Sequence, residues 1–419
     1  MFTISQPVIE THDGKCRMTS TFSAPGLDKE IFFETEAAYG QYLTHEVADA
    51  FVVAAMLPAL MAGEDIEVPC VSQELAYHFN TIMFLLGKAF DTPPIRLHAG
   101  ESVETDFQPK AVGTAISGGV DSLCTFVNHT SDTCPEGMRI SQLTLFNVGA
   151  YGNDYDKTSK WFEREALRAR AFAEDVGLPL VLLQSNFSEI YTHEKISHYS
   201  LRQDLCISAA VLALQKLFRI YYISSALTID IVDVNPHNQA HYEAMLTQRL
   251  SNAHTNILVA EHDLDRVQKT KMLACNPLAR KHLYVCLAEI LNEQEGYDRY
   301  TRNGVPHCTE CYKCLRTIGT LDLLGVADDF ASRFDIAKWK ALREQYYVDI
   351  YLNRKSDHFD AEIWDLFLET GHELSPAQWE KIREREAEWM NKHPRPQPSA
   401  RTCLRILGGK VLRKLGLKK

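Results

Sequence analysis

The sequence has no long hydrophobic stretch and no N-terminal targeting pattern. Its longest apolar run, 51–62, is shorter than the about 18 residues that suggest a membrane-spanning helix. The N-terminus lacks a basic region followed by an apolar core, so no signal peptide is visible. We therefore expect a cytoplasmic protein. In that compartment the 11 cysteines should be mostly reduced, so clustered cysteines indicate metal binding rather than disulfides.

Excess positive charge and internal repeats are also missing. The 419 residues carry a formal net charge of −11, which argues against a surface that coats nucleic acid. With 45% hydrophobic and 24% charged residues, the composition is that of a globular protein. The length predicts about two or three domains.

Strand-like and helical patterns alternate through the middle of the chain. A buried strand is expected at 111–116 and a helix at 121–129. The alternation continues with strands at 142–148, 180–184 and 219–225 and helices at 157–176 and 204–218. This rhythm predicts an α/β fold with a mostly parallel, doubly wound sheet that is covered on both faces. Ligands bind such sheets at the carboxyl ends of the strands.

A glycine-containing turn follows the first of these strands. Its six residues are Ser117-Gly118-Gly119-Val120-Asp121-Ser122. The glycines permit a tight turn, the helix start offers unpaired N–H groups, and the hydroxyls can donate to phosphate. Asp121 would be repelled by phosphate unless it caps the helix or helps to hold Mg²⁺. The alternative is a plain strand-to-helix turn capped by Asp121, and no Gly-Lys-Ser/Thr follows as in the Walker loop.

This string after a buried strand resembles the signature of the PP-loop ATP pyrophosphatases. That family includes GMP synthetase, asparagine synthetase, 7-cyano-7-deazaguanine synthase and tRNA thiolation enzymes. Its members cleave ATP between the α- and β-phosphates: a substrate oxygen takes AMP, pyrophosphate leaves, and a nitrogen or sulfur nucleophile displaces AMP. The resemblance covers roughly residues 110–330 and implies an adenine nucleotide α-hydrolase-like fold that binds ATP and Mg²⁺.

The resemblance also implies roles for individual residues. Catalysis would fall to Ser117, Asp121 and Ser122. The ATP-binding residues would be Ser117, Gly118, Gly119, Val120, Asp121 and Ser122, with Phe146 and Asn147 near the adenine because the second strand ends there.

Four cysteines form a second candidate site. Cys308, Cys311 and Cys314 follow one another at three-residue spacing, and Cys286 lies upstream. Four cysteinates predict a closed tetrahedral zinc site with a structural role beside the ATP site. Unmetallated cysteines and an iron–sulfur cluster are the alternatives. Cys275 and His307 are substitute ligands, although His307 adjoins Cys308 and simultaneous ligation is awkward.

The cysteine spacing resembles the zinc site of 7-cyano-7-deazaguanine synthase-like proteins. The continuation 313–317 resembles a version found in PP-loop proteins of bacterial surface-polysaccharide gene sets. The chain departs from the deazaguanine enzyme in the hundred residues that precede the loop and in lacking its substrate-binding stretches. That enzyme's reaction is therefore an analogy only.

Several polar residues could face a substrate, although solvated loops and helix faces explain them equally. They are Arg202, Asp204, Asp230, Asp233, His237, His241, Arg266, Lys269 and Lys271. Cys124 and Cys206 are spare thiols in apolar helical patterns, which predicts that they belong to the core.

We predict five segments. They are an N-terminal α+β domain of unknown role at 1–108, the PP-loop ATP-binding domain at 109–262, the four-cysteine zinc module at 263–330, C-terminal helices at 331–392, and a Pro-rich linker with a basic amphipathic tail at 393–419. The tail (400–419) suits peripheral contact with an anionic membrane, at the inner face, or a disordered or partner-docked state.

The function implied by the resemblance is an AMP-forming ligase. It would adenylylate an oxygen of a small-molecule substrate, and a nitrogen nucleophile would then form an amide or nitrile, in surface-polysaccharide or modified-nucleobase biosynthesis. Met1-Phe2 offers no N-terminal cysteine to release ammonia from glutamine, so nitrogen would come as ammonia, as an amine, or from a partner glutaminase. The alternatives are sulfur transfer, with a sulfur-donating partner protein, and a non-catalytic zinc-containing nucleotide- or nucleic-acid-binding protein.

Overall fold

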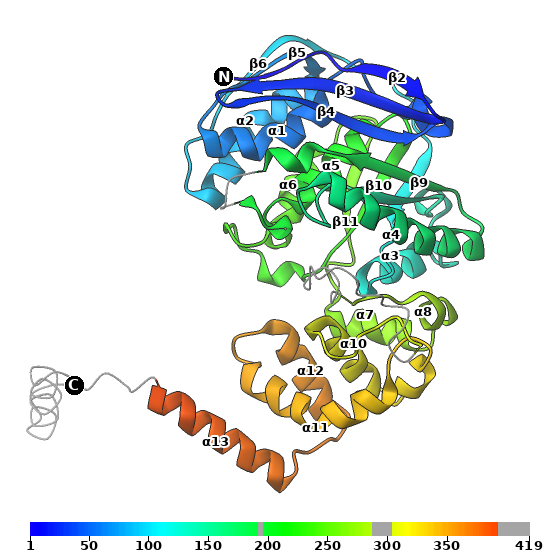
Figure 1. Cartoon of the computed structure of the whole chain (residues 1–419), viewed down its shortest axis with the longest axis vertical. Coiled ribbons are helices and arrows are strands. Elements are labelled where there is room, and N and C mark those ends of the chain that lie inside the picture. The colour runs from blue at the N-terminus through cyan, green and yellow to red at the C-terminus, as the bar shows by residue number, and fades with distance from the viewer. Residues whose placement is uncertain (192–195, 287–303, 393–419) are drawn as a thin grey trace, which may run out of the picture. The chain divides into compact units, whose positions relative to one another are not determined.

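The fold is known from a computed structural model that describes residues 1–191, 196–286 and 304–392. Contacts divide the chain into two compact units, residues 1–339 and 340–419. The first unit is built around one sheet of 11 strands with helices packed on it (Figure 1). The chain is thus α/β, as the sequence predicts. The five-segment division of the chain stays a prediction.

Five parallel strands form the half of the sheet that carries the glycine-containing turn. They are β7 (Ala111–Ala115), β8 (Gln142–Asn147), β9 (Leu180–Ser185), β10 (Phe218–Ser224) and β11 (Asn256–Ala260). Their order is β11-β10-β7-β8-β9, and all four pairings are parallel. The direction of winding reverses at β7. In such sheets a crevice opens outside the carboxyl ends of the strands at this reversal, and Ser117 lies there.

Helices cover both faces of this parallel half. The crossovers β7-α3-β8 and β8-α4-β9 use α3 (Val120–Thr130) and α4 (Tyr155–Val176), which meet through Phe126 and Phe172. The crossovers on the other side of the reversal use α5 (Gln203–Ala213) and α6 (Glu243–Leu250). Right-handed crossovers in opposite directions place these two pairs on opposite faces.

The first 103 residues extend the same sheet. They supply β1 (Phe2–Ile4), β2 (Val8–His12), β3 (Lys15–Ala24), β4 (Leu27–Glu36), β5 (Ile66–Ser72) and β6 (Leu97–Val103). β4 pairs antiparallel with β9, which joins this part to the parallel half. The helices α1 (Asp49–Ala62) and α2 (Gln73–Phe90) belong to the same hydrophobic cluster as α5. α1 is buried over nearly its whole length, which accounts for the longest apolar run of the sequence.

The largest difference from the predicted element boundaries lies between α5 and β10. The helix expected at 204–218 ends at Ala213, and β10 begins at Phe218 rather than Arg219. Both corrections concern a segment that is apolar on all sides, in which periodicity marks no end. The strand β11 is an addition to the strands that the sequence predicts.

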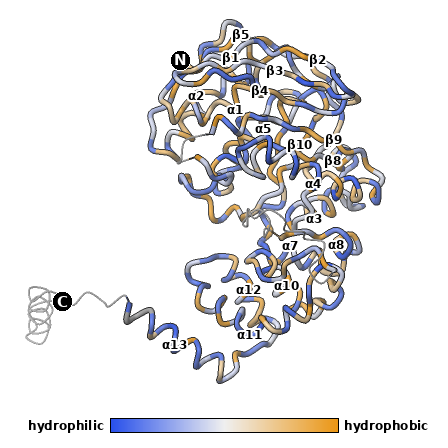
Figure 2. Tube along the Cα trace, viewed as in Figure 1, coloured by the Kyte–Doolittle hydropathy of each residue, from blue (hydrophilic) through white to orange (hydrophobic). Residues whose placement is uncertain are grey.

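The remaining helices follow the parallel half. In the first unit they are α7 (Arg266–Ala274), α8 (Pro277–His282) and α10 (Tyr312–Leu323), and α11 (Ile336–Asn353) crosses the division between the units. The second unit continues with α12 (His358–Glu369) and α13 (Pro376–Lys392). The residues of α13 are mostly hydrophilic (Figure 2). Tyr351 meets the rings of Trp364 and Trp379 edge-on there. Most of the stretch 336–392 is helical.

Among the described residues, no helix is both long and apolar enough to cross a membrane. The predicted linker and basic tail, 393–419, lie outside the described part of the chain.

Candidate functional site

The turn after β7 leaves the start of α3 open. Gly119 is the residue before the helix, and no side chain caps the helix there. Ser117 Oγ accepts from the Gly119 N–H at 3.3 Å and lies 3.0 Å from Ser122 Oγ. Ser122 Oγ in turn donates to Gly119 O at 3.1 Å. The first N–H groups of a helix have no intrahelical acceptor, so this end can receive an anion.

Gly118 is essential to the shape of the turn. Its φ is +76°, a conformation that L side chains rarely adopt. A Cβ built there would lie 3.1 Å from His282 O and 3.2 Å from Tyr284 Cβ. The backbone also binds there, because the Tyr284 N–H donates to Gly118 O at 2.7 Å. The segment after α8 therefore packs directly on the turn.

Basic residues surround Asp121. Arg266 Nη2 lies 2.8 Å from Asp121 Oδ2, and Lys269 Nζ lies 3.8 Å from Oδ1. Lys269 is buried, and its ammonium donates to Ser225 O at 2.6 Å. Lys313, at the start of α10, lies near the same charges. Desolvation, and then the charge of Arg266, lower its pKa. Asp121 is thus held by cations rather than capping the helix, and the cations outnumber it.

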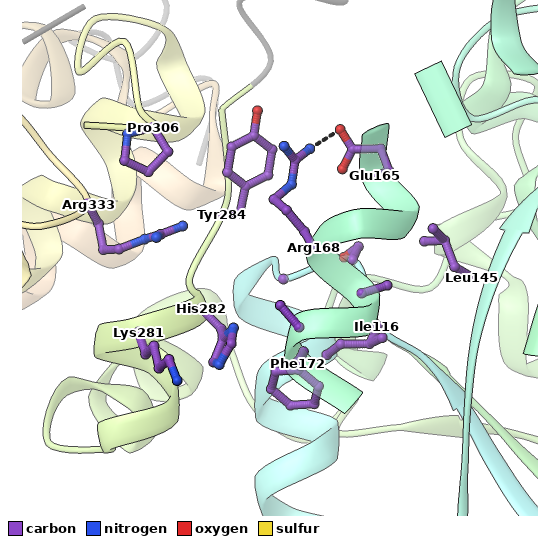
Figure 3. Close-up of a pocket in the computed structure, with 14 residues that line it drawn as sticks. Ile116, Leu145, Glu165, Arg168, Phe172, Lys281, His282, Tyr284, Pro306 and Arg333 are labelled. Atoms are coloured by element: carbon purple, nitrogen blue, oxygen red, sulfur yellow. Dashed lines mark hydrogen bonds and ion pairs between the residues drawn. The ribbon is translucent and has the colours of Figure 1, made fainter. Parts of the chain in front are cut away.

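A cavity of about 260 Å³ opens beside the turn. Its apolar wall comes from Ile116 after β7, Leu145 of β8 and Phe172 of α4. Figure 3 shows Arg168 beside Tyr284 at the rim, with the guanidinium 3.8 Å from the ring centroid. Arg168 also pairs with Glu165. An apolar cavity with a polar rim is typical of small-molecule sites.

Phe146 and Asn147, which the resemblance places near adenine, are not among the residues that line the cavity. Leu145 lines the cavity, whereas the next residue, Phe146, points to the other face and stacks with Tyr221, 5.8 Å between ring centroids. Asn147 is buried, and its Nδ2 donates to Thr158 Oγ1 at 3.3 Å. Alternation along the strand explains this difference. The adenine contact of Phe146 and Asn147 stays a prediction.

The four predicted cysteines come together. The Sγ atoms of Cys286, Cys308, Cys311 and Cys314 all lie within 4.8 Å of one another, and the Sγ atoms of Cys308 and Cys314 are 3.8 Å apart. Tetrahedral zinc with Zn–S bonds of about 2.3 Å requires sulfurs about 3.8 Å apart. A cluster that binds each cysteine through a different iron would spread them more widely. The arrangement therefore fits one ion such as zinc.

Electrostatics also favour a cation in this group. A hydrogen bond with Cys286 lowers the pKa of Cys308, whereas contacts with the other three sulfurs raise the pKa of Cys314. Four thiolates cannot share so small a volume unless a metal ion balances their charge. Cys275, the substitute ligand, is exposed and does not belong to the group.

His307 is a structural residue instead of a ligand. Its Nε2 accepts from the Val285 N–H at 3.0 Å, which leaves the proton on Nδ1, and Nδ1 donates to Arg333 O at 2.7 Å. Arg333 Nε donates to Leu283 O at 2.9 Å. These contacts fix the stretch 283–286, which joins the turn after β7 to the cysteine group.

A second set of buried polar residues lies in the segments that follow β8, β9 and β10 in the chain. Arg202 is fully buried: Nη2 donates to Asn153 Oδ1, the guanidinium lies 4.1 Å from the Tyr191 ring centroid, and Nε and Nη1 have no hydrogen-bond partner. Both carboxylate oxygens of Asp204 also lack a partner. The sequence singled out these two residues but not Glu243, which is buried nearby. No local motif marks Glu243, because only the packing of α5 against α6 brings it there.

The other candidate residues show no such arrangement. Asp230, Asp233 and His237 are exposed, and His241 Nδ1 contacts Ile231 O at 3.0 Å. Among the described residues, the only group of three or more potential ligands is the cysteine group. Cys124 and Cys206 are buried core residues, as predicted.

Comparison with known proteins adds no further guide. No protein-family model matches the chain, and no match was found among curated proteins or solved structures. The function therefore has to be argued from the site itself.

Proposed function

We propose that the chain is an AMP-forming ligase of the ATP pyrophosphatase type, which adenylylates a substrate oxygen and releases pyrophosphate. One observation carries this proposal: the open start of α3 lies at the winding reversal of the parallel strands, beside Arg266 and Lys269. A polyphosphate would meet donors and positive charge together there.

The β- and γ-phosphates are best accommodated at the helix start. The N–H groups at the start of α3 and the hydroxyls of Ser117 and Ser122 would donate to phosphate oxygens. Lys269 is held by Ser225 O and Asp121, so its charge is positioned before the ligand arrives. Such preorganised charge stabilises the departing pyrophosphate without further rearrangement.

The adenosine is best accommodated in the cavity beside the turn. The cavity begins at Ser117 and Gly118, and its wall is apolar at Ile116, Leu145 and Phe172. A base that enters there would leave its phosphates at the start of α3. The rim residues Arg168 and Tyr284 would close one side (Figure 3).

The residues at the turn fit a magnesium–ATP complex. Within the described part of the chain, Asp121 Oδ1 is buried and accepts no hydrogen bond, and Lys269 Nζ, 3.8 Å away, is too distant to donate one. Mg²⁺ commonly binds one or two carboxylates and completes its shell with phosphate oxygens and water. When bound, the ion neutralises charge on the leaving group. The chain itself contributes positioning, through Arg266 and Lys269 holding the Asp121 carboxylate.

Pyrophosphate release tests the proposal. Purified protein is given ATP, Mg²⁺, pooled cytosolic metabolites and ammonium, and pyrophosphate and AMP are measured. We expect substrate-dependent release of both and a loss of at least about a hundredfold in Asp121→Ala, comparable to removing one preorganised charged group. Asp233→Ala, which changes an exposed carboxylate after β10, is the matched control and should retain full activity.

Other products would identify the alternatives. ADP and phosphate would show that cleavage between the α- and β-phosphates is wrong. ATP binding without any turnover over the full pool would favour a non-catalytic nucleotide-binding protein.

A further inference from the structure

Two buried carboxyl groups lie at the carboxyl edge of the parallel strands, beyond Lys269. Asp204 is in the first turn of α5 and Glu243 is in the first turn of α6. Asp204 exposes 0% of its surface and Glu243 exposes 4%. Ser225, which follows β10, is buried with them. The phosphate-binding role proposed above uses neither carboxyl group.

Asp204 is an acceptor without a donor. Both carboxylate oxygens are buried, and neither has a hydrogen-bond partner among the residues that the structure describes. Gln239 Oε1 accepts from the Asp204 backbone N–H at 2.9 Å, so Gln239 satisfies the helix start and leaves the side chain free. An ionised carboxylate in such a place costs several kcal/mol. Burial raises the pKa of Asp204 to about 7, so the group is present both with and without its proton near neutral pH.

Ser225 holds the carboxyl group of Glu243. Ser225 Oγ lies 2.6 Å from Leu227 O and 2.5 Å from Glu243 Oε1. The Ser225 hydroxyl is the donor in both contacts, and the carbonyl and the carboxyl oxygens accept. Burial, and then the charge of Asp204, raise the pKa of Glu243 to about 9. The two carboxyl groups thus differ, one neutral and one able to accept a proton.

Contacts connect Glu243 to the turn after β7. Lys269 Nζ lies 3.8 Å from Asp121 Oδ1 and donates to Ser225 O at 2.6 Å, and Ser225 Oγ contacts Glu243. Other titratable or charged groups also act on the pair or feel its charge. They are Arg202, Tyr199 and Cys206 from the α5 side, Tyr242 from α6, and Asp121 from α3.

We propose that Asp204, with Glu243 beside it, binds the nitrogen nucleophile of the reaction as an ammonium ion or a primary ammonium group and removes its proton. This inference rests on the proposed adenylylation, since it assigns the second substrate of the same site. N–H groups would satisfy the unpartnered Asp204 oxygens, and a positive charge would offset its negative one. A sulfide or thiolate nucleophile would instead bring negative charge to a buried carboxylate.

The proton and bond changes balance. Asp204 takes one proton from the ammonium nitrogen, and the freed lone pair attacks the activated carbon. The bond from that carbon to the oxygen of AMP breaks, and AMP leaves with the electron pair. The second proton on the new C–N bond passes to solvent. Glu243 acts as a positioning residue, because Ser225 and Lys269 join it to Asp121 at the turn.

Ammonium binding can be measured without knowing the other substrate. Thermal unfolding is followed in ammonium, sodium or potassium chloride at equal ionic strength, at about pH 6 and about pH 8. We expect ammonium to raise the unfolding midpoint of the wild type above that in sodium chloride, more strongly at the higher pH, where Asp204 is ionised. Asp204→Asn should lose this difference and Glu243→Gln should weaken it. Asp49→Asn, a buried carboxyl that already accepts from the Ser72 N–H, should retain it.

Equal effects of ammonium and potassium, or an undiminished ammonium effect in Asp204→Asn, would overturn the inference. The pyrophosphate assay adds a second test, with hydroxylamine, which is already unprotonated at neutral pH, in place of ammonium. We expect Asp204→Asn to lose at least about tenfold with ammonium and little with hydroxylamine. Wild-type turnover with sulfide but not ammonium would refute the amine site and leave adenylylation intact. Ammonium binding without any pyrophosphate release would support the amine site and count against adenylylation.

Discussion

Single residues decide whether the phosphate turn can form, and Gly118 does so in two ways. Its positive φ needs glycine, and its missing Cβ lets His282 and Tyr284 approach the turn. Gly177, which ends α4, has a φ of +67°, but a Cβ added to it would meet nothing within 4 Å. Comparing substitutions at the two glycines therefore distinguishes the effect of backbone strain from the effect of a close contact.

Alanine at each position should cost about 1 kcal/mol of unfolding free energy, because a Cβ disfavours a positive φ. Only Gly118→Ala should also weaken ATP binding, by at least about tenfold, because it pushes the segment 282–284 off the turn. Denaturant unfolding and calorimetric titration measure the two effects. Equal ATP affinity in the two variants would contradict the role given to Gly118.

The buried carboxyl pair should make stability fall as pH rises. Asp204 and Glu243 have pKa values raised from 3.8 to about 7 and from 4.5 to about 9, so the folded chain binds protons that the unfolded chain releases. Their contribution is constant below about pH 4, declines from there to about pH 9, and is level beyond. Asp204→Asn and Glu243→Gln should each flatten this decline. Unfolding free energies at several pH values test this, and unchanged slopes would show that the groups are ionised in the fold.

How far the site could be predicted differs from residue to residue. The turn and the cysteines are visible in the sequence because their members are close together along the chain. Glu243 and Ser225 are not, because each is an ordinary polar residue until packing brings them together. His307 is a candidate ligand by its position next to Cys308, whereas in the fold its two nitrogens serve the backbone of Val285 and Arg333.

At the scale of elements, the stretch 283–286 is the link between the metal group and the phosphate turn. Tyr284 binds Gly118 O, and two residues later Cys286 joins the cysteine group. Chelating the metal should therefore lower the unfolding midpoint and expose the Tyr284 amide to hydrogen exchange, even without ATP.

Cys311→Ser should lose the metal, whereas Cys275→Ser should keep one ion per chain, counted by elemental analysis. Bound iron would change the assignment of the ion from zinc to iron. An unchanged exchange rate of the Tyr284 amide would refute the link through 283–286.

Elements with one apolar face were predictable, and elements apolar all round were less so. α4 has a buried side at Phe162, Ala166 and Ala169, and its predicted span of 157–176 agrees closely with the structure. α5 is buried over almost its full length, so its sequence pattern runs on into the start of β10. β11 is a short strand of five residues between two helical segments, and its pattern does not stand out from its surroundings.

At the scale of the whole molecule, the first 103 residues and the parallel half share one sheet and one core. β4 covers the edge of β9, and Phe33 packs with both Phe51 and Phe187 in the cluster that includes α5. A chain that begins at residue 109 would expose this edge and this apolar surface, both of which promote aggregation. We expect it to be insoluble or to lack a cooperative unfolding transition. Co-expression with residues 1–108 should restore solubility, and a soluble, cooperative 109–419 chain would contradict the shared core.

The contact between Tyr284 and Gly118 also sets an order on synthesis. The ribosome makes the glycine turn long before it makes the cysteines that hold 283–286 against it. A nascent chain that stops short of Cys314 has the turn but lacks the complete metal group that fastens the segment beside it. The complete arrangement of turn and neighbouring segment is therefore acquired late, after most of the sheet has been made, and we expect an interrupted translation product to lack it.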